Sequence, residues 1–210
     1  MGLRAVVFDY GMVLTGPPDP IAYDHLLRIT GLTAERLDSI YWADRNAFDE
    51  GKLTGFGFWE KIVGDAGLKL GQAELDELNL WDARMWTTEN EAMLAWQLKV
   101  KERGFLTGIL SNMGENVLSN MERTFDWLPR FDVLVWSFQL HMVKPDAAIY
   151  RHLLKELGTR AEETLFIDDR AVNIEAAEAL GIKGLVFTTV EQLRADLIAQ
   201  GFDKVLPLPG

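Results

Sequence analysis

The pattern of apolar and polar residues predicts short strands that alternate with helices. Five apolar runs rich in Val, Ile, Leu and Phe are each bounded by glycine or polar residues, which is typical of strands. They lie at residues 3–8, 105–110, 133–136, 164–167 and 184–187. Apolar residues three and four apart predict helices between the later runs. This alternation predicts an α/β fold with a doubly wound parallel sheet.

A longer helical segment separates the first two predicted strands. The stretch 16–20, Gly-Pro-Pro-Asp-Pro, predicts a stiff connector because proline fixes φ and lacks the amide N–H. Helical spacing follows it and is broken by a glycine-rich stretch at 50–59, which predicts a loop. We therefore expect an α/β core of residues 1–15 and 88–210, into which an α-helical cap domain of residues 16–87 is inserted.

The ends of the predicted helices carry further signals. Gly31 and Gly158 follow helical segments at the position where glycine commonly ends a helix. Thr88 and Glu91 have the spacing of a capping box, which predicts that the next helix begins at Thr88. The tail 206–210, Leu-Pro-Leu-Pro-Gly, is expected to be frayed.

Polar residues suited to catalysis stand where the predicted strands end. Ligands of open α/β sheets bind at the carboxyl ends of the strands, so we expect these side chains to meet at one edge. A carboxylate, a hydroxyl, a lysine and an acidic pair suit chemistry on a phosphate held by a metal ion. The residues are Asp9, Ser111-Asn112, Lys144-Pro145 and Asp168-Asp169.

Composition and charge narrow the possible partners. The 210 residues include 32 acidic and 21 basic side chains, and the net charge of −11 argues against nucleic acid and anionic membranes. There is no cysteine, which excludes disulfides, thiolate catalysis and cysteine metal sites. No apolar stretch is long enough to span a bilayer, and the first residues predict a strand, not a signal peptide. We therefore expect a cytoplasmic protein.

Four motifs, in order along the chain, resemble those of the haloacid dehalogenase (HAD) superfamily of phosphatases and related hydrolases. The resemblance covers nearly the whole chain, and the helical insertion is similar to the small cap that the family places between its first and second motifs. It implies a Rossmann-like core and a hydrolase. The motifs are Asp9-Tyr10-Gly11-Met12-Val13, Ser111-Asn112, Val143-Lys144-Pro145 and Phe166-Ile167-Asp168-Asp169.

By this resemblance, Asp9 attacks phosphorus, forms an aspartyl-phosphate and binds the metal ion. The backbone carbonyl of Gly11 is implied as a further metal ligand. Gly11 also stands where the family usually has a second aspartate as general acid/base, and general acid catalysis contributes about 10²–10⁴-fold. We therefore expect a preference for good leaving groups, such as anomeric, acyl and aryl phosphates, unless another cap or loop residue, or water, substitutes.

The other three motifs imply the rest of a phosphate and magnesium site. Ser111 and Asn112, with nearby backbone amides, are implied to bind phosphate oxygens. Lys144 is implied to neutralise the nucleophile and the phosphate. Asp169 is implied as a direct ligand of Mg²⁺, and Asp168 as a second ligand or as the holder of a metal-bound water.

The predicted cap supplies candidates for substrate selection. Arg45 and the glycine loop 51–57 are candidates for contact with the substrate, although a solvated helix position is the alternative for Arg45. The tryptophans of this segment are expected in the cap core, with one or two at the entrance. A cap of this kind closes over the site, excludes water and selects the substrate.

These observations favour a Mg²⁺-dependent phosphatase acting on a small phosphorylated metabolite. A second hypothesis is metal-independent hydrolysis at carbon, as in haloacid dehalogenases. The pair Asp168-Asp169 argues against it, because unneutralised carboxylates repel an anionic substrate. A third hypothesis is a non-catalytic protein that binds a phosphometabolite. We expect a monomer or a homodimer.

Overall fold

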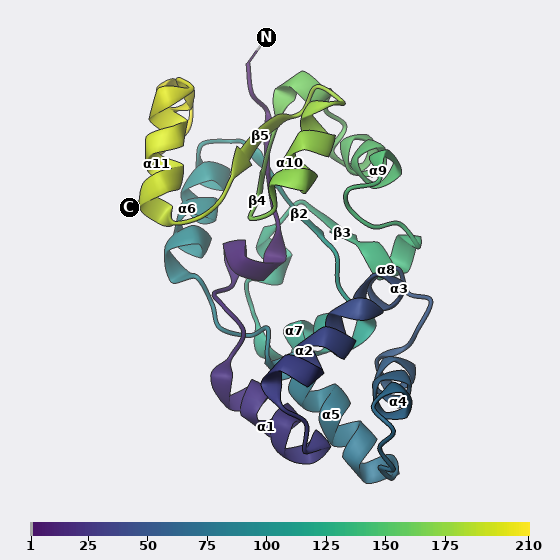
Figure 1. Ribbon diagram of the computed structural model, residues 1–210. Helices are drawn as coiled ribbons and strands as arrows, with labels where there is room; N and C mark the ends of the chain where they lie inside the picture. The colour runs from purple at the N-terminus through teal and green to yellow at the C-terminus, as the bar shows by residue number, and fades with distance from the viewer. Residues whose placement is uncertain (1) are drawn as a thin grey trace.

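The computed structural model describes residues 2–210, and a five-stranded sheet lies at the centre of one end of the molecule (Figure 1). All neighbouring strands are parallel, and their order is β3-β2-β1-β4-β5. Phe8 in β1 pairs with Ile109 in β2 on one side and with Ile167 in β4 on the other. The predicted doubly wound sheet is confirmed. The strands are β1 (Ala5–Phe8), β2 (Leu106–Ser111), β3 (Val133–Trp136), β4 (Thr164–Asp168) and β5 (Lys183–Val186).

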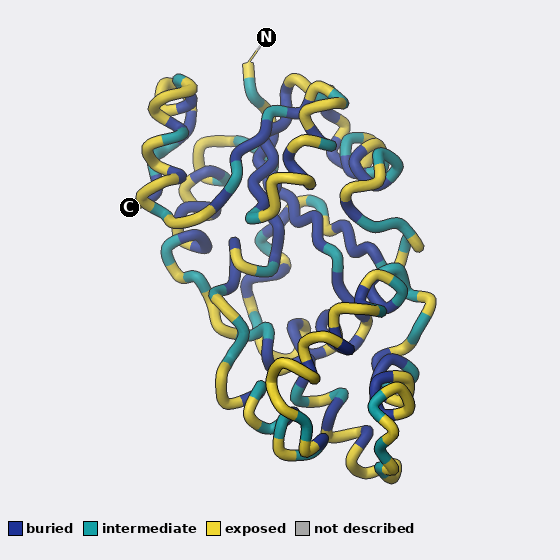
Figure 2. Tube along the Cα trace, viewed as in Figure 1, coloured by how far each residue is buried: buried dark blue, intermediate teal, exposed yellow. Residues whose placement is uncertain are grey.

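Helices cover both faces of the sheet, which explains why the strands are apolar at nearly every position. In β1, Val6 and Phe8 join the apolar core under α6 and α11, whereas Ala5 and Val7 join the core under α9 and α10. The central strands β1 and β4 are buried along their whole length (Figure 2). The helices of this part are α6 (Glu91–Glu102), α7 (Glu115–Thr124), α8 (Ser137–Leu140), α9 (Ala147–Leu157), α10 (Ala171–Glu178) and α11 (Val190–Ala199), with short turns η2 (Leu128–Arg130), η3 (Ala161–Glu163) and η4 (Phe202–Lys204).

The segment between β1 and β2 contributes five helices that lie together beyond the carboxyl ends of the strands (Figure 1). They have an apolar core of their own, which includes Leu26, Phe58, Trp59 and Leu78. The inserted helical unit of the prediction is therefore present. Its helices are α1 (Pro20–Thr30), α2 (Ala34–Ala43), α3 (Arg45–Asp49), α4 (Gly55–Asp65) and α5 (Gln72–Arg84).

The two connectors to this insertion are paired with each other. Thr15 and Glu89 form an isolated antiparallel bridge, and the amide of Gly16 donates to the carbonyl of Thr88 at 2.8 Å. The proline-rich stretch ends inside a helix, because Pro20 is the first residue of α1 and needs no N–H there.

The insertion is also attached to the sheet unit at two other places. Helix α7 packs along α5 (Figure 1), and the Asn116 side chain donates to the carboxylate of Asp82 at 2.9 Å. The hydroxyl of Ser137, at the start of α8, donates to the backbone carbonyl of Asp49 at 2.5 Å. These contacts fix the position of α3 relative to the carboxyl ends of the strands.

Two predicted helix boundaries are wrong. Helix α6 begins at Glu91 and not at Thr88, because Asn90 is the N-cap and its side chain accepts from the amide of Met93 at 3.3 Å. The predicted loop 50–59 ends early, since Thr54 caps α4 by accepting from the amide of Gly57 at 3.0 Å. A polar cap thus outweighs the low helix propensity of the glycines.

The C-terminal tail is ordered, so the prediction of a frayed end is wrong. The indole N–H of Trp96 donates to the carbonyl of Pro207 at 2.7 Å, and Arg194 donates to the carbonyl of Pro209 at 2.8 Å. Leu206 is buried in the core under α6 and α11. Tertiary hydrogen bonds therefore hold a segment that has no regular structure of its own.

We predict that Leu206→Ala lowers the free energy of unfolding by about 2 kcal/mol or more, because it removes buried methyl groups from a packed core. Urea denaturation measures the change. The neighbouring Val205 is 47% exposed, so Val205→Ala is the control and is expected to stay within about 0.5 kcal/mol. Equal effects of the two substitutions would contradict the packing of the tail.

Candidate active site

The candidate site lies where the strand order reverses. The chain proceeds outward from β1 to β2 and β3, then returns to place β4 and β5 on the other side of β1. Such a switch point leaves a crevice at the carboxyl ends of the strands. Asp9 follows β1, Ser111 ends β2 and Asp168 ends β4. The topology therefore brings together residues that are far apart in sequence.

Lys144 joins two of these strand ends. Its buried ammonium group lies 2.9 Å from a carboxylate oxygen of Asp9 and 2.7 Å from one of Asp168. Asn112 holds the backbone of this lysine from both sides, because its amide donates to the Lys144 carbonyl at 2.9 Å and accepts from the Lys144 N–H at 2.8 Å. The side chain of Asn112 is thus engaged with the lysine loop, while Asn112 also lines the pocket.

Asp168 is fully buried, and both of its oxygens are held by the protein. One oxygen accepts from the amide of Arg170 at 2.8 Å and from Asn173 at 2.9 Å. The other accepts from Lys144 and from Asn173 at 3.0 Å. The hydroxyl of Tyr150 donates to the Asn173 carbonyl at 2.8 Å, which fixes the turn after β4.

Burial and charge shift the ionisation of this group. Burial raises the pKa of Asp9 to about 7, against the opposing charge of Lys144 and with the support of Asp168 and Asp169. Burial and the charge of Asp168 also raise the pKa of Asp169. Burial alone would lower the pKa of Lys144, but the charges of Asp9 and Asp168 raise it above its ordinary value. The site therefore has more negative charge than the lysine neutralises.

The donor set fits a hard divalent cation. Asp9, Asp168 and Asp169 each offer a carboxylate oxygen, and these oxygens lie within 4.8 Å of one another. Gly11 lines the same pocket. Oxygen ligands from few protein positions, with room left for substrate oxygens, are characteristic of Mg²⁺ sites.

The turn after Asp9 sets the direction of its side chain. The amide of Tyr10 donates to one carboxylate oxygen of Asp9 at 2.7 Å, and Tyr10–Leu14 (η1) is a kinked turn in which Gly11 and Met12 have non-helical backbone angles. A Cβ atom at Gly11 would meet no atom within 4 Å, and the φ of −63° is open to any residue. The site therefore has space for the carboxylate that this motif lacks.

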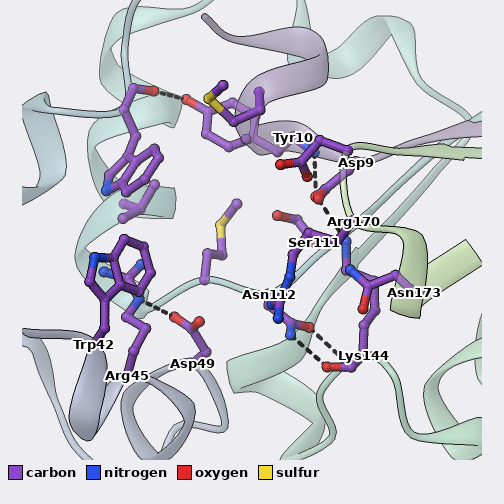
Figure 3. A pocket seen from close by; sticks show the side chains of 16 residues that line it. Asp9, Tyr10, Trp42, Arg45, Asp49, Ser111, Asn112, Lys144, Arg170 and Asn173 are labelled. Carbon is purple, nitrogen blue, oxygen red and sulfur yellow. Dashed lines mark hydrogen bonds and ion pairs between the residues drawn. The ribbon is translucent and has the colours of Figure 1, made fainter. Parts of the chain in front are cut away.

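The pocket above these residues is closed on its far side by the insertion. Figure 3 shows Trp42, Arg45 and Asp49 across the pocket from Asp9 and Ser111. Ser111, the last residue of β2, lines the pocket on the side of the sheet. Trp42 and Trp86 are the tryptophans among the lining residues, and residues 51–57 contribute nothing to the described lining.

Arg45 is buried, so the alternative of a solvated helix position is wrong. Its Nε atom lies 2.8 Å from Asp49, and its Nη1 atom donates to the Tyr41 hydroxyl and lies 3.8 Å from Asp82. Four aromatic rings surround the guanidinium, with centroids 5.1–5.9 Å from Cζ. Sequence reasoning missed Asp49, because nothing in the local pattern predicted the short helix that turns it toward the pocket.

Part of the chain matches a known protein family, and nearly the whole chain resembles several known proteins. A family model described as haloacid dehalogenase-like hydrolase matches residues 88–187. Bifunctional epoxide hydrolase 2 of Rattus norvegicus is 31% identical over 218 residues, which cover 92% of this chain and 38% of that protein. A phosphatase of Mycobacterium tuberculosis (strain CDC 1551 / Oshkosh) is 26% identical over 205 residues, which cover 94% of this chain and 93% of that protein.

Solved structures share the fold. A HAD family enzyme from Bacteroides thetaiotaomicron, in complex with magnesium and inorganic phosphate, has a TM-score of 0.73 at 21% identity, covering 89% of this chain and 95% of the other. L-2-haloacid dehalogenase from Xanthobacter autotrophicus has a TM-score of 0.69 at 18% identity. The match covers 98% of this chain and 85% of the dehalogenase.

The fold and the site define an α/β unit whose acidic strand ends face a helical insertion. Residues 88–187 match the haloacid dehalogenase-like hydrolase family, and the fold is shared with HAD family enzymes. It spans 38% of the length of the epoxide hydrolase relatives. No helix within residues 2–210 has the length and apolar character needed to cross a membrane.

We predict that Arg45→Met destabilises the protein by about 3–5 kcal/mol, because it leaves the carboxyl groups of Asp49 and Asp82 buried without their cation. Thermal or urea unfolding measures the loss. Arg36 is exposed on α2, and Arg36→Met is the control, with an expected change within about 0.5 kcal/mol. A stable Arg45→Met variant would show that the cluster is not held by this charge.

Proposed function

We propose that this chain is a Mg²⁺-dependent phosphatase that acts on a small phosphorylated metabolite. The observation that carries the proposal is the meeting of three carboxylates within 4.8 Å, with a single buried lysine between two of them. A phosphate dianion is repelled by this group unless a divalent cation is bound as well. Hydrolysis of a phosphate ester uses both the cation and the acidic residues that hold it.

The residues divide the reaction between them. Asp9 attacks phosphorus through a carboxylate oxygen and forms an aspartyl-phosphate. Lys144 holds Asp9 in place and neutralises charge on the phosphoryl group. Ser111 donates to a phosphate oxygen, while Asn112 acts by fixing the Lys144 loop. Water then attacks the aspartyl-phosphate and releases inorganic phosphate.

Asp9, Asp169 and the carbonyl of Gly11 are the proposed ligands of Mg²⁺. Asp168 is a weaker candidate for direct binding because both of its oxygens already accept hydrogen bonds from the protein, and it serves to hold Lys144 and a metal-bound water. When bound, the cation neutralises phosphate charge and orients the phosphoryl group. Residues 16–87 form the proposed cap, in which Trp42 and Arg45 face the substrate.

The relatives support this choice over the two alternatives. One relative along nearly the whole chain is a phosphatase, and a structure of the same fold holds magnesium and inorganic phosphate. A dehalogenase also shares the fold. Metal-independent hydrolysis at carbon fits poorly here, since the acidic pair at the end of β4 would repel a carboxylate substrate without a cation. A purely binding protein would not need a nucleophile placed beside the lysine.

We predict that phosphate release from p-nitrophenyl phosphate and acetyl phosphate requires Mg²⁺ and falls to background in Asp9→Asn. EDTA is expected to abolish the activity, and added Mg²⁺ to restore it. Asp126→Asn is the control, because the Asp126 side chain is 91% exposed and is not among the residues that line the pocket. Phosphate release that survives in Asp9→Asn would rule out the aspartyl-phosphate mechanism.

We predict that wild-type kcat/KM is higher for acyl, aryl and anomeric phosphates than for alkyl phosphates such as sugar 6-phosphates. Gly11 supplies no proton to the leaving oxygen, so esters that leave readily as anions keep an advantage even when a residue of the insertion supplies that proton. A panel of these substrates at saturating Mg²⁺ tests the order. Equal kcat/KM values across the panel would contradict a preference for good leaving groups.

A further inference from the structure

Gly11 has no side chain that could donate a proton, so another group has to protonate the poorer leaving groups. In phosphoryl transfer the attacking and leaving oxygens lie roughly in line. Asp9 attacks from the sheet, so the leaving oxygen faces the insertion across the pocket (Figure 3). We propose that Asp49, on that opposite side, donates the proton to the leaving oxygen. This inference rests on the proposed phosphatase function.

Asp49 is selected by elimination among the described residues that line the pocket. The lining carboxylates are those of Asp9, Asp49 and Asp169, and the first and last belong to the nucleophile and the metal site. The hydroxyl of Tyr10 donates to the Trp86 carbonyl and is therefore engaged. Asp49 is the acid that remains.

The hydrogen bonds of the Arg45 cluster leave one carboxyl oxygen, Oδ2 of Asp49, available to carry a proton. Both oxygens of Asp82 accept hydrogen bonds, one from the Tyr41 hydroxyl at 2.7 Å and one from Asn116 at 2.9 Å, as expected of a carboxylate. Asp49 accepts from Arg45 through one oxygen, Oδ1. Within the described chain its Oδ2 atom has no hydrogen-bond partner, although Asp49 lines the pocket.

The charge of the cluster supports the same assignment. One guanidinium faces two buried carboxyl groups, so two carboxylates would leave an uncompensated negative charge out of water. A proton on Oδ2 of Asp49 removes that charge without disturbing the bond to Arg45. Burial raises the pKa of Asp49 above its ordinary value, despite the nearby cation, which is consistent with a protonated acid.

Asp49 is also fixed in position relative to the sheet. Its backbone carbonyl accepts from Ser137, and the neighbouring Phe48 lies where a Cβ atom at Gly114 would strike its ring. A general acid has to sit at a defined distance from the leaving oxygen. These contacts supply that position although Asp49 lies in the insertion.

The proposed reaction transfers one proton from Asp49 to the alcohol and returns one from water. An oxygen of Asp9 bonds to phosphorus, the bond from phosphorus to the ester oxygen breaks with its electron pair on that oxygen, and the proton of Asp49 passes to it. The alcohol leaves, and Asp49 is a carboxylate. Asp49 then takes a proton from water as the water oxygen bonds to phosphorus, and the phosphorus bond to Asp9 breaks. The products are inorganic phosphate, the Asp9 carboxylate and protonated Asp49.

The test is the dependence of the first turnover on the leaving group. Phenyl phosphates with ring substituents, together with an alkyl phosphate, are mixed with enzyme and Mg²⁺, and release of the alcohol or phenol is followed before steady state. We expect Asp49→Asn to release p-nitrophenol at nearly the wild-type first-turnover rate. It is expected to lose about 10²-fold or more on the alkyl ester, where protonation matters most.

Three variants separate catalysis from structure. Asp82→Asn alters the same charge cluster without touching the pocket and is expected to keep the wild-type dependence on the leaving group. Asp49→Glu keeps a carboxyl group and is expected to retain part of the rate on the alkyl ester. Adding Gly11→Asp to Asp49→Asn is expected to restore turnover of the alkyl ester, since Gly11 has space for a side chain.

Asp49 is not the acid if Asp49→Asn slows every ester by the same factor, or if Asp82→Asn steepens the dependence equally. A measurement on wild type needs no variant: first-turnover rates on the alkyl ester are expected to fall in D₂O, whereas those on p-nitrophenyl phosphate are not. The absence of that difference also overturns the inference. If wild type shows no first turnover that depends on Asp9, the proposed function itself fails, which is a separate result.

Discussion

The ammonium group of Lys144 lies between the carboxylates of Asp9 and Asp168, at 2.9 and 2.7 Å, where the strand order reverses. Two carboxylates at the ends of adjacent strands would otherwise repel each other in a buried site. Asn112 holds the lysine backbone from β2, and Asn173 holds Asp168 from α10. Three separate strands are thus tied to one cation, and the geometry of the pocket follows from that tie.

A second buried ionic group faces the first across the pocket. In the insertion, the guanidinium of Arg45 is shared by Asp49 and Asp82 and enclosed by aromatic rings. The two groups differ in what they leave unbalanced. The sheet side has excess negative charge that suits a divalent cation, whereas a proton on Asp49 would leave one carboxylate to balance one cation on the insertion side. The pocket therefore has an electrostatic polarity along the direction in which a phosphoryl group would be transferred.

The sequence predicted the site residues that directly follow apolar strands. It did not predict side-chain positions that depend on packing between segments far apart in the chain. Apolar runs ending in polar residues placed Asp9, Ser111 and Asp168 at strand ends, and the family resemblance ordered them. The orientation of the Asn112 amide toward Lys144 depends on a loop that lies beyond the next strand. Asp49 has its place because α3 docks on α8 through Ser137, a contact between residues 88 positions apart that no local pattern encodes.

The glycines at the seam between the insertion and the sheet unit have a mechanical consequence. Backbone or ring atoms occupy the space where a Cβ would stand at Gly51 and Gly114, so the two units meet at close range. Swinging the whole insertion away would break this seam together with the paired connectors. Trp42, which is 55% exposed on α2, is among the residues that line the pocket. Because the seam and the paired connectors hold the insertion at several points, the width of the pocket is coupled to the packing at Gly51 and Gly114.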